Sequence, residues 1–139
     1  MKLKNILIVV SDLERSKGFY HDLFGLDVIR DLGGNVILTE GLVLQEKAVW
    51  EKLLGRAVSS GDADSLLYFE ETDLESFRRK LGQYPGQVRY LETATSPEEG
   101  VIRLYDPDGH LIEVREREDG RVWKRRQEIK AYSSMREKE

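Results

Sequence analysis

The first half of the chain alternates short apolar runs with one amphipathic segment. Residues 3–10 are rich in Leu, Ile and Val and are too few for a stable isolated helix, so they predict a strand. Ser11 and Glu14 then form a capping box, and apolar residues at helical spacing continue to Gly25, which predicts a helix of about three turns. Three more strands are predicted after this helix, over residues 26–30, 35–39 and 42–47.

The second half repeats this order of elements. Residues 65–71 predict a strand, and Thr72 and Glu75 form a second capping box. The helix that they open ends at Gly82. Three strands are predicted after it, over residues 88–92, 101–105 and 110–117.

A fixed offset relates the two halves, because Asp73 stands 61 residues after Asp12 and at the same place in its helix start. Each half is one βαβββ unit and is too small to hold a stable core alone. We therefore expect an α+β fold in which two tandem βαβββ modules, residues 1–56 and 62–117, pack into a single domain over residues 1–117.

A tail follows this domain over residues 118–139. Four large apolar residues in it lie loosely at helical spacing, which predicts a helix: Trp123, Ile129, Tyr132 and Met135. Such a helix packs either on its own domain or on a partner chain, and the second case makes the protein an interaction module.

Composition excludes several kinds of site. The chain has 139 residues and no cysteine, which excludes a disulfide scaffold, a thiolate zinc site, an iron–sulfur cluster and a cysteine nucleophile. The first apolar run is too short for a signal peptide or a membrane span. We therefore expect a cytoplasmic protein with no membrane contact.

Charge is divided unevenly along the chain. The formal net charge is −4, made up of −7 over residues 1–114 and +3 over residues 115–139. Nucleic-acid binding generally needs a basic face across the domain, and this domain is acidic. We therefore expect no nucleic-acid partner.

Two segments carry a family resemblance. The helix start Ser-Asp-Leu-Glu-Arg-Ser at residues 11–16 is followed by Phe-Tyr at 19–20 and Leu-Phe-Gly-Leu at 23–26, and residues 105–114 read Tyr-Asp-Pro-Asp-Gly-His-Leu-Ile-Glu-Val. The most specific piece is Asp-Pro-Asp-Gly-x-x-x-Glu. With the order of elements, these segments make the chain resemble the vicinal oxygen chelate superfamily, which includes glyoxalases, bleomycin- and fosfomycin-resistance proteins and extradiol dioxygenases.

This resemblance implies a cupped mixed sheet, a pocket between paired halves or paired chains, and a homodimer. Enzymatic members hold a divalent metal with side chains from the first and last strands of each half. The implied ligand positions fall on Asn5, Leu44, Leu66 and Glu113. Only Glu113 is a good ligand there, since Asn5 offers a neutral carbonyl oxygen and the two leucines offer no donor.

Glu46 is the one substitute ligand, because strand alternation places it on the face of Leu44. A set of Glu46, Glu113 and Asn5 suits at most weak magnesium or manganese binding. We therefore expect no cofactor, with such weak metal binding as the alternative. The two histidines, His21 and His110, fall at no ligand position and are interpreted as structural.

Glu113, the best candidate for a catalytic residue, has three interpretations. In the first, it forms a structural pair with Arg103 across the last hairpin. In the second, the same pair orients Arg103 toward an anionic ligand. In the third, Glu113 is buried without a partner and is a general base of raised pKa. Aromatic residues divide between pocket and core, with Phe19, Tyr20 and Phe24 assigned to the core. The candidate pocket comprises Asn5, Leu44, Glu46, Trp50, Leu66, Tyr68, Arg103, Tyr105 and Glu113.

The leading hypothesis is a homodimeric small-molecule-binding protein of the glyoxalase and bleomycin-resistance type. It lacks the usual metal triad and acts by sequestering or sensing its ligand. The alternative is a metal-dependent lyase, isomerase or dioxygenase that uses Glu46 and Glu113 as a reduced ligand set.

Overall fold

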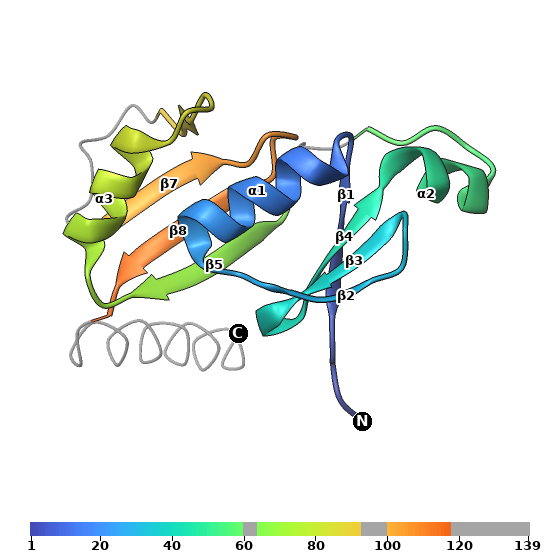
Figure 1. The fold of residues 1–139 in the computed structure, drawn as a ribbon, viewed down its shortest axis with the longest axis horizontal. Helices are drawn as coiled ribbons and strands as arrows, with labels where there is room; N and C mark the ends of the chain where they lie inside the picture. Colours follow the sequence, from blue (N-terminus) through green and yellow to red (C-terminus); the bar gives the residue numbers. More distant parts are fainter. Residues whose placement is uncertain (60–63, 93–99, 118–139) are drawn as a thin grey trace, which may run out of the picture.

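The structure is a computed structural model and describes residues 1–59, 64–92 and 100–117 (Figure 1). The predicted tail helix, with Trp123 and Met135, lies outside the described residues.

The first module folds into a four-stranded mixed sheet, sheet A, in the order β1-β4-β3-β2. The strands β1 and β4 are parallel, and the other pairs are antiparallel. A short 3-10 turn, η1, leads into β4. The elements are β1 (Ile6–Val10), α1 (Leu13–Phe24), β2 (Val28–Asp31), β3 (Asn35–Leu38), η1 (Thr39–Gly41), β4 (Leu42–Glu46) and α2 (Lys47–Leu54).

The second module repeats the arrangement as sheet B, in the order β5-β8-β7-β6. Again the first and last strands are parallel neighbours, and the remaining pairs are antiparallel. The elements are β5 (Leu66–Glu71), α3 (Leu74–Gln83), β6 (Arg89–Tyr90), β7 (Val101–Tyr105) and β8 (Leu111–Glu116). The prediction of an α+β fold with two tandem βαβββ modules is therefore confirmed, and each module forms its own sheet.

The two helix starts differ by one residue from the predicted capping boxes. The N-cap of α1 is Asp12, whose side chain accepts a hydrogen bond from Arg15 N at 3.1 Å, and the N-cap of α3 is Asp73, which accepts from Ser76 N at 2.9 Å. Aspartate is as good a cap as serine or threonine. The side chain of Ser11 is therefore available for a contact with the second module.

The core is shared by the two modules. Phe19 and Tyr20 on α1 are almost fully buried, as predicted. Phe24, at the end of the same helix, packs its ring 4.6 Å from that of Phe69 on β5 and 5.4 Å from that of Phe77 on α3. Figure 1 shows α1 lying across sheet B next to α3. Because the first module's helix packs on the second module's sheet, neither module has a core of its own.

A polar clasp, formed by the 106–110 turn and the start of α1, also joins the modules. Ser11 donates from both its backbone N and its Oγ to Asp108 Oδ1, at 3.0 and 2.6 Å. Tyr20 donates from its hydroxyl to Asp106 Oδ2 at 2.7 Å, in the protein interior. The Asp-Pro-Asp-Gly-His segment that carries much of the family resemblance therefore attaches β7 and β8 to the helix of the other module.

His110 completes the clasp, with its Nδ1 2.7 Å from Asp106 Oδ2. Burial alone would lower the pKa of His110, but the contact with the Asp106 carboxylate outweighs it and raises this pKa above its ordinary value. Burial would likewise raise the pKa of Asp106, but the contacts from His110 and Tyr20 lower it. His110 therefore has a structural role, as interpreted from the sequence.

Candidate functional site

Each sheet has one face against the core and an opposite face, here called its distal face. On β8, Ile112 and Val114 are buried in the core. Because side chains alternate along a strand, Glu113 and Arg115 lie on the distal face of sheet B. The strand register places Tyr68 on one side of Glu113 and Arg103 on the other. These neighbours bring the candidate residues of three strands together.

Glu113 lies at the centre of this face and is only 4% exposed. Its Oε1 accepts a hydrogen bond from Arg103 Nε at 2.9 Å, and its Oε2 accepts one from Arg115 Nε, also at 2.9 Å. The predicted pair with Arg103 is thus present. Arg115 was missed at the sequence level, although its position two residues after Glu113 on the same strand was a usable signal.

The two guanidinium groups determine the protonation state of Glu113. Burial would raise the pKa of this carboxyl, but the hydrogen bonds and charges of Arg115 and Arg103 outweigh it and hold the pKa below its ordinary value. Glu113 is therefore ionised at neutral pH. The interpretation of Glu113 as a buried, unpaired base with a raised pKa is wrong.

Tyrosine side chains flank the ion cluster. Tyr68, opposite Glu113 on β5, is 38% exposed. Tyr105 lies two residues after Arg103 on β7, and the Arg89 guanidinium is 5.6 Å from the centre of its ring, within range of a cation–π interaction. The distal face of sheet B thus combines arginine side chains with aromatic ones.

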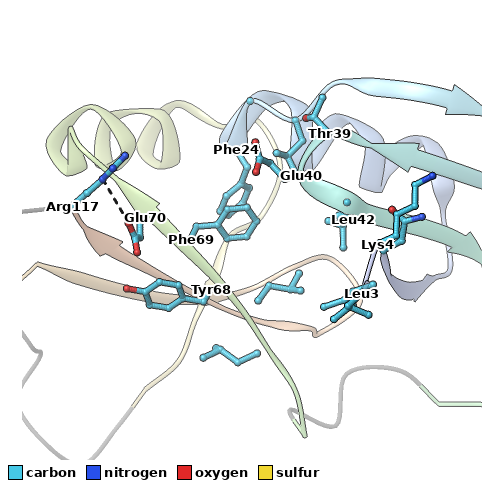
Figure 2. A pocket seen from close by; sticks show the side chains of 17 residues that line it. Leu3, Lys4, Phe24, Thr39, Glu40, Leu42, Tyr68, Phe69, Glu70 and Arg117 are labelled. Carbon is cyan, nitrogen blue, oxygen red and sulfur yellow. Dashed lines mark ion pairs between the residues drawn. The ribbon is translucent and has the colours of Figure 1, made fainter. Parts of the chain in front are cut away.

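A groove of about 800 Å³ runs beside this face, along the edge strand β5 (Figure 2). The rings of Phe24 and Phe69 lie against each other within it, and Tyr68 lies on the side of the Glu70–Arg117 ion pair. Leu3, Lys4 and Leu42 lie toward the opposite end. The candidate residues Asn5, Leu66 and Tyr68 all line the groove, whereas Glu113 does not.

Other candidate positions are corrected by the structure. Leu44 is fully buried in the core, so it does not face a pocket. Glu46 follows the same alternation: it pairs with Val10 on the core side of sheet A and is the N-cap residue of α2. Trp50 lies on α2 and lines neither the groove nor the distal face of sheet B.

The physical reason for this correction is a register error of one residue. Leu7 and Tyr68 are 61 residues apart, and Leu7 pairs with Val43 just as Tyr68 pairs with Glu113. The counterpart of Glu113 in the first module is therefore Val43. A shift of one residue moves a side chain to the other face of a sheet, which placed Leu44 and Glu46 on the wrong side.

The residues at the ligand positions implied by the resemblance do not fit a divalent metal ion. Asn5 carries a neutral amide, Leu66 carries no donor atom, and both oxygens of Glu113 contact arginine. Within residues 1–59, 64–92 and 100–117, no three His, Asp or Glu side chains are grouped so that they could hold an ion.

Comparisons with known proteins agree with this fold. The family model described as a Glyoxalase-like domain matches residues 3–118. A protein of unknown function from Agrobacterium tumefaciens is 32% identical, with 85% of this chain and 95% of that chain covered and a TM-score of 0.70. No curated protein matches.

Two more distant structures share the fold. A glyoxalase-related enzyme from Fulvimarina pelagi is 23% identical, with 84% of this chain and 88% of that chain covered and a TM-score of 0.65. The fosfomycin resistance protein FosX from Listeria monocytogenes is 16% identical, with 85% and 92% covered and a TM-score of 0.61. Separately, none of the described helices is long and apolar enough to cross a membrane.

Proposed function

The chain belongs to the glyoxalase-like family of the vicinal oxygen chelate superfamily, and from this premise we propose that it binds a small organic molecule without a metal ion. The observation that carries the proposal is the pairing of Glu113 with Arg103 and Arg115. The single strong donor among the implied ligand positions is held by two cations, which compete with a metal for the same oxygens. The protein then acts by sequestering or sensing its ligand.

The proposed binding site is the distal face of sheet B together with the adjoining groove. Leu66 and Tyr68 belong to both, so a ligand on one extends into the other. Ligand sites in proteins are mostly apolar concavities with a few polar groups that fix orientation. The rings in the groove and the arginine cluster on the distal face supply these two components.

The metal-dependent alternative needs Glu46 and Glu113 to share one ion. Glu46 lies on the core side of sheet A, where it begins α2, whereas Glu113 lies on the distal face of sheet B. No observation on the described residues favours that function. A cytoplasmic location and the lack of a nucleic-acid partner stay predictions.

We also propose that a second copy of the chain covers the groove. Large apolar side chains on β5, on β1 and in the segment before β1 are between 36% and 81% exposed, and a pattern of this kind marks an interaction site. They are Leu3, Ile6, Leu7, Leu66 and Tyr68. A homodimer formed here encloses the ligand site between two chains.

The dimer is tested by the mass in solution from light scattering. The wild-type protein is expected to be a dimer, and Ile6→Asp is expected to make it a monomer because a charge enters the apolar patch. Leu53→Asp, on the exposed side of α2, is the matched control and leaves the dimer unchanged. A monomeric wild-type protein contradicts this part of the proposal.

Binding is tested by NMR with a library of neutral and charged aromatic fragments and the full-length protein. The fragments that bind are expected to shift the backbone resonances of Tyr68, Arg103 and Tyr105. Tyr68→Ala is expected to weaken this binding at least fivefold. Fragments that bind only elsewhere, or with affinities that Tyr68→Ala does not change, contradict the proposed site.

A further inference from the structure

We propose that the ligand is an organic anion, whose carboxylate or phosphonate-type group is bound by Arg103 and Arg115. This inference rests on the proposed function, because it gives the chemical class of the molecule that occupies the distal face of sheet B. Glu113 is in this case a positioning residue that holds both guanidinium groups in place.

The first supporting observation is the local charge. The protein as a whole carries a formal charge of −4. On and beside the distal face of sheet B, by contrast, the described residues include four arginines and two glutamates: Arg89, Arg103, Arg115, Arg117, Glu70 and Glu113. This excess of positive charge among the described residues of an otherwise acidic protein favours anions at this face.

The second observation is the depth at which each charge lies. The Glu113 side chain is 5% exposed, whereas those of Arg103 and Arg115 are 30% and 24% exposed. The carboxylate is thus buried beneath the two guanidinium groups, and the cations reach the surface. This order presents positive charge to an incoming ligand and keeps the negative charge away from it.

The third observation is the way in which the arginines bind Glu113. Both hydrogen bonds to Glu113 come from the Nε atom of an arginine, so the carboxylate fixes the direction of each guanidinium group. The planar group binds carboxylates and phosphates as a two-pronged fork, and a fork already held in place loses less conformational entropy on binding. Glu113 therefore orients the donors before the ligand arrives.

The neighbouring tyrosines indicate that the anion has an organic body. Tyr68 and Tyr105 lie on the same face as the arginine pair, and Tyr68 also lines the groove. Tyrosine rings combine a large apolar surface with a polar tip. We therefore expect the charged group to bind the arginines and the body to lie against these rings.

The test uses three probes of similar shape: benzoate, phenylphosphonate and neutral benzamide, each titrated into the full-length protein and followed by NMR. Both anions are expected to bind at least tenfold more tightly than benzamide. The affinities of benzoate and phenylphosphonate also show whether the site prefers a carboxylate or a phosphonate. Arg115→Gln is expected to weaken anion binding at least tenfold and to change benzamide binding less than twofold.

Arg78→Gln is the matched control, because Arg78 pairs with Glu75 on the exposed side of α3. This variant removes the same charge from the protein and is expected to leave the affinity for each probe within twofold of wild type. Equal losses in Arg78→Gln and Arg115→Gln mean that net charge alone attracts the anions, which overturns the proposed site.

Glu113→Gln tests the positioning role separately. It removes a negative charge from the face, so a purely electrostatic effect strengthens anion binding. Loss of the positioning carboxylate is expected to weaken it at least threefold instead, in a variant whose circular dichroism spectrum matches wild type. Tighter anion binding in a folded Glu113→Gln protein contradicts the role of Glu113, and the Arg115→Gln result still tests the arginine site.

The outcomes separate this inference from the proposed function. If benzoate and benzamide bind equally well and shift Tyr68, the face binds small molecules without preference for anions, and only this inference fails. If no probe shifts the resonances of Tyr68, Arg103 or Tyr105, both proposals are contradicted.

Discussion

The distal faces of the two modules carry different chemistry at the same register positions. In the first module, Val43 lies between Leu7 and Ile37 on the two neighbouring strands. This row of three side chains across the sheet is therefore apolar. In the second, Glu113 lies between Tyr68 and Arg103. The order and pairing of the strands are therefore repeated in the second module, whereas the charged site is not.

The next row extends the same contrast. Gln45 lies where the second module has Arg115, and it is 6% exposed. Its Oε1 accepts a hydrogen bond from Asn35 Nδ2 at 2.8 Å, and its own Nε2 donates to the Gly34 carbonyl oxygen at 3.1 Å. The first module thus satisfies its distal polar groups with neutral hydrogen bonds. The comparison shows that strand register specifies the fold, and that the side chains at a few register positions specify the chemistry.

The largest expected effect comes from placing the second module's carboxylate in the first module. Val43→Glu is expected to lower the free energy of unfolding by about 4 kcal/mol, because a buried carboxylate gains no cation from its neighbours Leu7 and Ile37. Urea denaturation at pH 7 measures this loss, and Val43→Gln is the uncharged control. A loss no larger than that of the control shows that the first module tolerates the charge.

The reverse exchange is expected to have a smaller effect on the free energy of unfolding. Glu113→Val removes the partner of two guanidinium groups that are partly hydrated, so we expect a loss of about 2 kcal/mol at pH 7. Because the pKa of Glu113 is lowered in the folded protein, its contribution is present above the unfolded value of 4.5 and is lost as the pH falls through the folded one. Denaturation curves measured at pH 7 and pH 3 are expected to show a smaller difference in the free energy of unfolding between wild type and Glu113→Val at pH 3. An equal difference at both values contradicts the ion pairs.

A triple exchange replaces the ion cluster of Glu113 with the residues at the equivalent positions of the first module. Arg103→Ile, Glu113→Val and Arg115→Gln together are expected to leave the free energy of unfolding within about 1 kcal/mol of wild type, since replacing the carboxylate together with both arginines leaves neither Glu113 nor these two cations without each other. Urea denaturation checks the stability. A triple variant less stable than Glu113→Val alone contradicts the comparison, because the residues of the first module then do not fit this register.

A small effect is also expected at the turn between β7 and β8. His110→Asn is expected to cost about 1 kcal/mol at pH 6, where the charged imidazole contacts Asp106. The pKa of His110 is raised by folding, so its contribution is full below the unfolded value of 6.5 and is lost as the pH rises through the folded value. Melting temperatures at pH 6 and pH 9 are expected to show a smaller difference from wild type at pH 9.

His21→Asn is the control for this experiment. His21 also contacts an aspartate, Asp22, but its side chain is 63% exposed, and exposed pairs contribute little to stability. A similar pH dependence in both variants shows that the clasp has no special role.

Local signals in the sequence were sufficient for the order of elements and for the strand pairing at Glu113. The first helix of each module begins where a cap residue precedes an amphipathic run, and Arg103 lies opposite Glu113 as the hairpin turn suggested. The links between modules were not predictable in this way. Ser11 and Asp108 are 97 residues apart, and no local pattern indicates that they bind each other.

The face of the sheet on which a side chain lies was predicted less well in the first module than in the second. The turn before β8 is tight, so counting from Gly109 reaches Glu113 correctly. The link before β4 instead contains η1 and a residue with positive φ, Glu40 at 67°. Counting three residues from Gly41, as Glu113 lies three residues after His110, reached Leu44 and so misplaced the register. An error of one residue there exchanged Val43 for Leu44 and moved the predicted site into the core.

Calorimetric titration of the full-length protein with Mn²⁺ tests most directly whether Glu113 binds arginine rather than a metal. We expect no binding in the micromolar range for the wild-type protein and the same result for Glu113→Val. Micromolar Mn²⁺ binding that Glu113→Val abolishes would contradict the account, because the carboxylate would then leave its arginine partners for a metal ion.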